Sequence, residues 1–159
     1  MKTYRLRTKQ TLPISLQQVW DYFSNPNNLR DITPPDLNMT VRTDTDGRIY
    51  NGMVIEYHVT PLAGLRVRWL TEIKHVNAPY MFVDEQRFGP YQFWYHQHFF
   101  QEVNGGVEVT DLIYYRIPFS LLSPLINRLV VEGKLSHIFN FRRQVLADKF
   151  GTVGKRAAE

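Results

Sequence analysis

The sequence predicts an α+β fold in which a curved antiparallel sheet of about seven strands wraps around a long C-terminal helix, with two short helices after the first strand. Residues 37–117 contain strand patterns separated by turn signals at hairpin spacing, which is typical of an antiparallel meander. Apolar residues then recur every three or four positions from residue 125 to 146. Because one helix covers only part of a sheet face, we expect the sheet to curl around it and enclose a cavity.

The first part of the chain predicts one strand followed by short helices. Basic side chains alternate with neutral or apolar ones over residues 3–12, which indicates a strand with a basic outer face. Pro13 ends this strand, and a second helical turn is expected over residues 29–32, before Pro34 and Pro35. Between them Ser15 is placed to cap a helix whose apolar residues have helical spacing: Leu16, Val19, Trp20 and Phe23.

Six further strands and the long helix account for the rest of the chain. The helix is expected to begin near Pro124, a residue favoured at the first helical position, and to end at Gly151. It would be about 27 residues and roughly 40 Å long. The turns expected between the strands are Asp46-Gly47, residues 61–64, residues 77–79, Gly89-Pro90 and Asn104-Gly105.

The composition is that of an ordinary globular domain. The chain has 159 residues, 43% of them hydrophobic and 21% charged, which excludes disordered, collagen-like and coiled-coil classes. We therefore expect a single ligand-binding domain over residues 1–159 with a loose tail at residues 154–159. The 14% of aromatic residues exceeds what a small core usually needs.

Charge and hydropathy narrow the expected partners. The net charge of +4 is spread along the chain, which indicates a solvated surface and no nucleic-acid partner. No stretch approaches the roughly 20 apolar residues of a membrane span, and the chain contains no cysteine. We expect a cytoplasmic protein without stable membrane association, present as a monomer or weak homodimer.

Three segments resemble a known superfamily. They are VWDYFSNPNNLRDITPP (19–35), FVDEQRFGPYQFWYHQHFF (82–100) and VTDLIYYRIP (109–118). Together with the order of elements they are similar to the START-like, or SRPBCC, superfamily, which includes the birch-pollen allergen and polyketide cyclases, and within it to a bacterial branch of ligand-binding proteins. The resemblance covers nearly the whole chain. It implies a helix-grip fold and a pocket for an apolar lipid, polyketide or aromatic ligand, without implying a reaction.

Strand periodicity predicts which side chains face the cavity, because alternate residues share a face. In residues 107–117 the inward set is apolar except for Asp111. A two-residue turn at Asn104-Gly105 would place Asp111 opposite His98 and Tyr115 opposite Trp94. The inward set of the preceding strand is then Trp94, His96, His98 and Phe100.

The register of the preceding hairpin, whose turn is expected at Gly89-Pro90, is less firmly set by its turn. A turn at Gly89-Pro90 would place Glu85 opposite Trp94, so that Glu85 points inward. A slip of one residue would point Asp84 and Gln86 inward instead.

The polar residues on this aromatic wall allow three interpretations. Asp111 could accept a hydrogen bond from His98, so that the pair fixes the strand register or orients a polar ligand head. His96 and His98, two apart on a strand, could bind a metal together with a facing carboxylate. His98 could also act as a general base oriented by Asp111, as in a cyclase, dehydratase or isomerase of a polyketide-like substrate.

We expect a non-catalytic binding protein, since no nucleophile, phosphate-loop or dinucleotide motif is present. The resemblance implies that no metal is needed, and we expect no cofactor. If it is an enzyme, the candidate catalytic residues are His98, Asp111, His96 and Glu85. The expected ligand-binding residues are Trp69, Glu85, Trp94, His96, His98, Phe100, Asp111, Tyr115 and Phe141.

Overall fold

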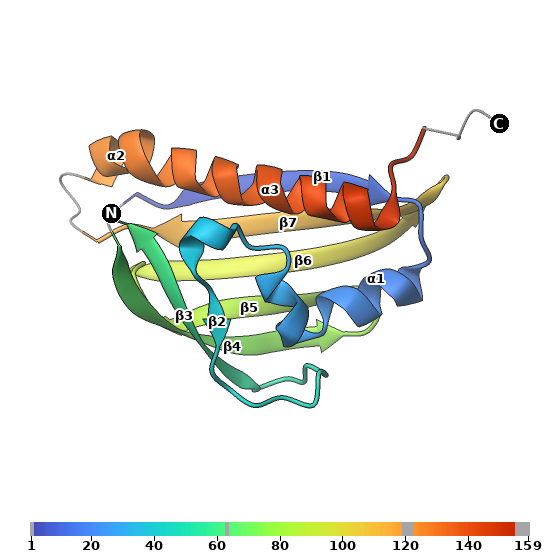
Figure 1. The fold of residues 1–159 in the computed structure, drawn as a ribbon, viewed down its shortest axis with the longest axis horizontal. Coiled ribbons are helices and arrows are strands. Elements are labelled where there is room, and N and C mark those ends of the chain that lie inside the picture. The colour runs from blue at the N-terminus through green and yellow to red at the C-terminus, as the bar shows by residue number, and fades with distance from the viewer. Residues whose placement is uncertain (1, 63, 119–122, 155–159) are drawn as a thin grey trace.

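The structure, a computed structural model, describes residues 2–62, 64–118 and 123–154. Apart from Gly154, the tail expected to be loose lies outside the described residues. The elements follow the predicted order (Figure 1): β1 (Tyr4–Leu12), α1 (Leu16–Phe23), the 3₁₀ helices η1 (Pro26–Arg30) and η2 (Pro35–Leu37), β2 (Thr40–Val41), β3 (Val54–Leu62), β4 (Leu65–Asn77), β5 (Met81–Phe88), β6 (Phe93–Val103), β7 (Gly106–Arg116), α2 (Ser123–Ile126), the π-helical turn η3 (Asn127–Val131) and α3 (Glu132–Phe150).

The described residues form one seven-stranded antiparallel sheet, as predicted. Its strand order is β1-β7-β6-β5-β4-β3-β2, so the first strand pairs with the last and every other neighbour is consecutive. The long helix runs along β1 and β7, while α1 and β2 lie across the open side of the curved sheet (Figure 1). Among the helices that the structure describes, none is long and apolar enough to cross a membrane.

Local capping explains the two short helical pieces. The Ser15 side chain accepts a hydrogen bond from the Gln18 backbone N–H, and the Gln18 side chain accepts one from the Ser15 backbone N–H, which is a capping box. The second turn begins earlier than residue 29, because the Asn25 side chain accepts from the Asn27 N–H and Pro26 fits the first helical position.

The β6–β7 hairpin confirms the register predicted from its turn. Asn104 and Gly105 form a two-residue connection, with Gly105 at a φ of 89°. His98 therefore lies opposite Asp111, and Trp94 lies opposite Tyr115. A glycine at positive φ fits the tight turn, and this short turn fixes every pair along the hairpin.

The register predicted for β5–β6 is wrong by one residue. Asp84 lies opposite His96, and Glu85 lies opposite Tyr95 instead of Trp94. The strands end at Phe88 and resume at Phe93, so the connection is longer than a two-residue turn. It is closed by the Gln86 side chain, whose Nε2 donates to the Tyr91 carbonyl at 2.7 Å. The shift turns Asp84 inward and Glu85 outward.

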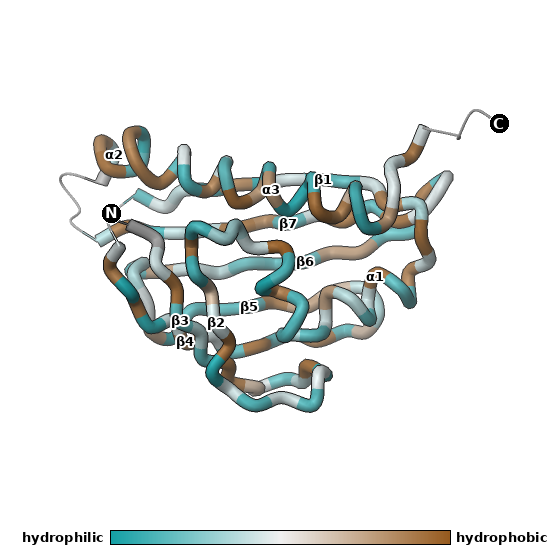
Figure 2. The backbone as a smooth tube through the Cα atoms, viewed as in Figure 1, coloured by the Kyte–Doolittle hydropathy of each residue, from teal (hydrophilic) through white to brown (hydrophobic). Residues whose placement is uncertain are grey.

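The long helix buries a narrower stripe than the sequence predicts. Leu135, Phe139, Arg142 and Leu146 are buried, at a spacing of three and four residues. Apolar and polar stretches alternate along the helix in Figure 2, as expected where one side packs on the sheet. Phe141 lies about 200° around the helix from Phe139, so it is not on the buried stripe. The helix ends at Gly151, as predicted, with φ 89°.

Candidate ligand-binding cavity

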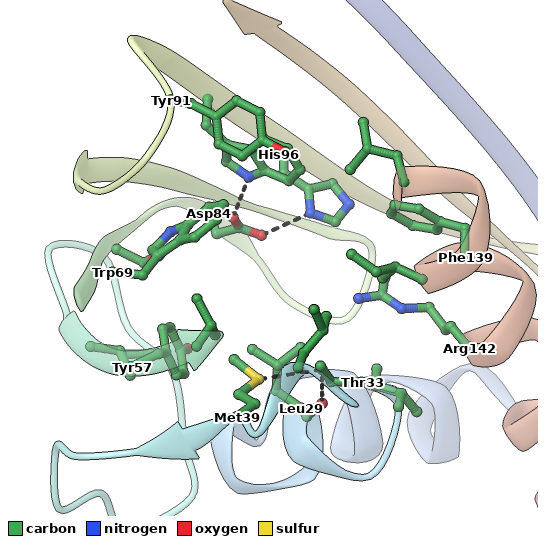
Figure 3. Close-up of a pocket in the computed structure, with 18 of the residues that line it drawn as sticks. Leu29, Thr33, Met39, Tyr57, Trp69, Asp84, Tyr91, His96, Phe139 and Arg142 are labelled. Atoms are coloured by element: carbon green, nitrogen blue, oxygen red, sulfur yellow. Dashed lines mark hydrogen bonds and ion pairs between the residues drawn. The ribbon is translucent and has the colours of Figure 1, made fainter. Parts of the chain in front are cut away.

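A cavity of about 400 Å³ lies between the long helix, the concave face of the sheet and the segment from α1 to β2. Its walls are mainly apolar and aromatic. The close-up in Figure 3 shows these side chains arranged around the space. The apolar wall, which we define by its members from the α1–β2 segment, β3 and β4, consists of Leu29, Ile32, Met39, Ile55, Tyr57 and Trp69.

Three aromatic rings line one end of the cavity. Trp69 and Trp94 meet edge to face with ring centres 5.3 Å apart, and the Tyr91 ring lies 4.8 Å from that of Trp94. Burial raises the pKa of Tyr91, so its hydroxyl stays protonated. Such rings present large apolar faces to a ligand at low entropy cost. Trp69 and Trp94 thus lie on the cavity wall, as predicted.

On the side of the cavity opposite the apolar wall, five polar side chains interact, and we call them the polar cluster: Asp84, His96, His98, Asp111 and Arg142. His96 Nε2 lies 2.8 Å from Asp111 Oδ1, and His96 Nδ1 lies 3.1 Å from Asp84 Oδ2. His98 Nε2 lies 2.7 Å from the same Asp84 oxygen, and Arg142 Nη1 donates to Asp111 Oδ1 at 3.0 Å. Asp84 and His96 lie side by side in Figure 3, with Arg142 extending from α3.

The electrostatics of the polar cluster favour the charged forms of Asp111, Asp84 and His96. Burial raises the pKa of Asp111, but Arg142 and the two imidazoles outweigh this and hold it well below its usual range. His96 and His98 likewise lower the pKa of Asp84. Burial lowers the pKa of His96, yet the carboxylates on its two sides leave it raised. The favoured state is therefore an imidazolium and a guanidinium paired with two carboxylates.

Two nitrogens of the polar cluster, on His98 and Arg142, lack a hydrogen-bond partner among the described residues. His98 is 5% exposed, and its Nε2 is close enough to donate to Asp84. Its Nδ1 lies 3.1 Å from Asp111 Oδ1 but makes no well-directed hydrogen bond to any described residue. On two further residues that line the cavity, the Tyr22 hydroxyl and Arg142 Nε are buried and also have no hydrogen-bond partner among the described residues.

The predicted pairing of Asp111 with His98 is only partly correct. The two residues are opposite each other, but Asp111 forms its imidazole hydrogen bond with His96. The Cα atoms of His98 and Asp111 are opposite each other, but this does not fix the direction of the imidazole ring. Because Asp84 points inward, His98 forms its hydrogen bond with Asp84 instead. Asp111 itself lies behind the imidazoles and does not line the main cavity.

Four other predicted ligand-binding residues are not among those that line the cavity. Glu85 is on the outer face, where it binds Lys74 Nζ at 2.6 Å. Phe100 packs against Phe23 and Trp20, because α1 fills that end of the sheet. The remaining two are Tyr115, whose hydroxyl donates to Asn127 Oδ1 at 2.8 Å, and the half-buried Phe141.

Sequence reasoning missed Asp84, Arg142 and Tyr22 as cavity residues. Asp84 was named only as the consequence of a register slip. Arg142 continues the three-and-four spacing of Leu135 and Phe139. Because charged residues are seldom buried, the sequence does not predict it on the buried side of the helix. Tyr22 is buried on α1, three residues after Val19, and this helical spacing is the signal that marks it.

Comparisons with known proteins identify the fold. No protein-family model and no curated protein matches the chain. The structure is similar to the protein TTHA0849 from Thermus thermophilus, with a TM-score of 0.70 and 15% identity over 92% of this chain and 97% of that one.

Two plant proteins have the same fold. The ginseng major latex-like protein 151 from Panax ginseng matches with a TM-score of 0.67 and 12% identity, over 93% of this chain and 97% of that one. A norcoclaurine synthase mutant from Thalictrum, in complex with a transition-state analogue, matches with a TM-score of 0.66 and 11% identity, over 93% and 96%. The chain thus has the helix-grip fold.

Proposed function

We propose that the protein binds an apolar small molecule of lipid, polyketide or aromatic type in this cavity and releases it unchanged. The observation that carries the proposal is the cavity itself. Its volume of about 400 Å³ falls within the range of small-molecule sites, and its walls are mostly apolar with a few polar groups on one side. Rings of the ligand would pack against Trp69 and Trp94.

Two unpartnered donors indicate a further chemical feature of the ligand. Tyr22 and Arg142 line the cavity, and the Tyr22 hydroxyl and Arg142 Nε are buried without a hydrogen-bond partner among the described residues. A buried donor without an acceptor is costly, and Arg142 Nε can only donate. The favoured ligand therefore carries an oxygen acceptor, such as a carbonyl, at the end that reaches these groups.

Native mass spectrometry of protein purified without added ligand tests the proposal first. We expect an added mass of a few hundred daltons on part of the protein, lost under denaturing conditions. The same spectrum should show a monomer or a weak homodimer. A bare chain that also fails to bind any apolar probe contradicts the proposal.

A matched pair of probes then tests the oxygen acceptor. We expect 2-acetylnaphthalene, a ketone, to bind more tightly than 2-ethylnaphthalene, which has nearly the same shape. Tyr22→Phe should weaken binding of the ketone by about one hydrogen bond, roughly 0.5 to 1.5 kcal/mol, and leave binding of the hydrocarbon unchanged. Equal losses for both probes would show that Tyr22 contributes packing alone.

A catalytic alternative is favoured by one observation. His98 faces the cavity and is hydrogen-bonded to Asp84 rather than to Asp111, so Asp84 would orient this imidazole as a general base in a cyclase, dehydratase or isomerase. The Thalictrum neighbour is a synthase, which shows that the fold can support a reaction.

The variant His98→Gln separates the two functions once a natural ligand has been recovered. In a binding protein it should change affinity by no more than about 0.5 to 1.5 kcal/mol. In an enzyme it should lower turnover by about a hundredfold while binding is retained. Conversion of the recovered compound by the wild type, and not by His98→Gln, would favour the enzyme.

A further inference from the structure

The polar cluster contains a set of side chains with the chemistry of a metal site. Asp84 from β5 and His96 and His98 from β6 each offer one ligand atom, and these three atoms all lie within 4.8 Å of one another. His96 and His98 share a face because they are two residues apart on a strand, and Asp84 is directly opposite His96. All three line the cavity.

We propose that Asp84, His96 and His98 bind one divalent transition-metal ion, with Asp111 and Arg142 as the supporting residues behind them. The proposal does not depend on the ligand-binding function, because it rests on a different set of atoms. Two imidazoles and one carboxylate form a common protein ligand set for Zn²⁺ and Fe²⁺.

The distances from the Asp84 ligand atom to the two imidazoles suit such an ion. Asp84 Oδ2 lies 3.1 Å from His96 Nδ1 and 2.7 Å from His98 Nε2. Ligands held about 2.0 to 2.2 Å from a metal ion lie roughly 3 to 3.5 Å apart, so only a small outward movement is needed. Because all three residues line the cavity, the remaining coordination positions open toward it, where water or an oxygen of the ligand has access.

The nitrogens that face away from this set already have a common carboxylate. Asp111 Oδ1 lies 2.8 Å from His96 Nε2 and 3.1 Å from His98 Nδ1. Metal-binding imidazoles usually donate their second N–H to a carboxylate or carbonyl, which fixes the tautomer and the ring orientation. Asp111 is in turn held by Arg142 Nη1 at 3.0 Å. Each imidazole thus has one nitrogen toward Asp84 and the other toward Asp111.

The unpartnered His98 nitrogen gives an independent reason for the proposal. Without a metal, the short contact with Asp84 places a proton on His98 Nε2, and the buried Nδ1 is left without a hydrogen bond. Coordination through Nε2 would move this proton to Nδ1, where a small rotation of the ring directs it to Asp111. Metal binding at Nε2 would therefore give the unpartnered His98 Nδ1 a hydrogen-bond acceptor in Asp111.

Titration of the metal-free protein with Co²⁺ tests the proposal. The full chain is dialysed against EDTA and then against buffer, and Co²⁺ is added while visible absorption is recorded. We expect bands of a nitrogen- and oxygen-bound ion that saturate at one Co²⁺ per chain and disappear when Zn²⁺ is added. Binding should also raise the melting temperature, because the ion binds only the folded protein.

Variants locate the site. His98→Gln and Asp84→Asn should lose the Co²⁺ bands at concentrations that saturate the wild type. Asp111→Asn should retain them but weaken affinity by about 10- to 100-fold. His137→Gln is the matched control, because His137 is an exposed histidine that contacts Asp36 on the surface. Circular dichroism and urea unfolding in EDTA establish that each variant is folded.

Two results would overturn the proposal. One is wild-type protein that binds neither Co²⁺ nor Zn²⁺ more tightly than the denatured chain does, and this outcome does not depend on the folding of any variant. The other is a folded His98→Gln protein that binds as well as His137→Gln. Probe binding to the cavity is measured separately in EDTA, so the ligand-binding proposal and the metal proposal can fail independently.

Discussion

The apolar wall and the polar cluster beside the cavity are stabilised by different interactions. The apolar wall is built from side chains such as Ile55 and Leu29, which need no specific partner and interact with neighbours through packing alone. In the polar cluster, Asp111 and His96 are each buried and charged and pair with each other, and Asp111 also pairs with Arg142. Substitutions in the apolar wall should therefore change stability by small steps, whereas loss of one member of the polar cluster leaves the others unpaired.

Removing Asp111 should have the largest effect. Asp111→Ala leaves the charges of Arg142 and His96 buried without their shared carboxylate. Breaking a buried pair in this way costs about 3 to 5 kcal/mol, so the free energy of unfolding in urea should fall by that amount. Glu108→Ala on the same strand removes the partner of Lys9 in a surface ion pair and should cost less than about 1 kcal/mol. Similar losses in both variants would show that the cluster is not a buried unit.

The pH dependence of stability should distinguish the polar cluster from the apolar wall. In metal-free protein the raised pKa of His96 gives stability that is fully present below its ordinary value of 6.5 and is lost as pH rises through the raised value. The lowered pKa values of Asp84 and Asp111 give stability that is present above 3.8 and is lost in acid.

Stability from these groups is therefore greatest between pH 3.8 and 6.5. The urea midpoint should fall between about pH 5 and pH 8 in the wild type. It should fall less in His96→Gln, which cannot lose this proton. An equal decrease in the two proteins would mean that His96 is not protonated between the carboxylates.

A conservative change in the apolar wall should have the smallest effect. Ile55→Val removes one methylene from a side chain that is almost fully buried beside the cavity. We expect a loss of about 0.5 to 1.5 kcal/mol in the free energy of unfolding, with the pH profile of the wild type retained. A larger loss than that of Asp111→Ala would reverse the proposed difference between the walls.

The same contrast explains how far the sequence predicts the structure. The Asn104-Gly105 turn and the Ser15 cap are local signals, and they correctly predict the β6–β7 register and the start of α1. The β5–β6 connection depends on hydrogen bonds between the Gln86 side chain and the Tyr91 backbone, and no local sequence pattern predicts these bonds.

Three-dimensional packing decides the remaining site residues. Arg142 is buried because Asp111 from a distant strand neutralises it, so its position could not be predicted from the helix alone. Phe100 faces inward as predicted but meets Trp20, which fills that part of the concave face. Strand periodicity therefore gives the direction of a side chain, whereas the outline of the cavity depends on elements that pack across it.

The central claim, that a ligand occupies the space beside the long helix, is tested most directly by filling that space. Val130 lines the cavity, whereas the adjacent Leu129 is 69% exposed and does not. The fluorescence of N-phenyl-1-naphthylamine, an apolar probe, is titrated with wild type, Val130→Trp and Leu129→Trp. We expect saturable binding to the wild type and Leu129→Trp, and at least a tenfold loss in a folded Val130→Trp protein. Equal affinity of the two tryptophan variants for the probe would contradict the claim.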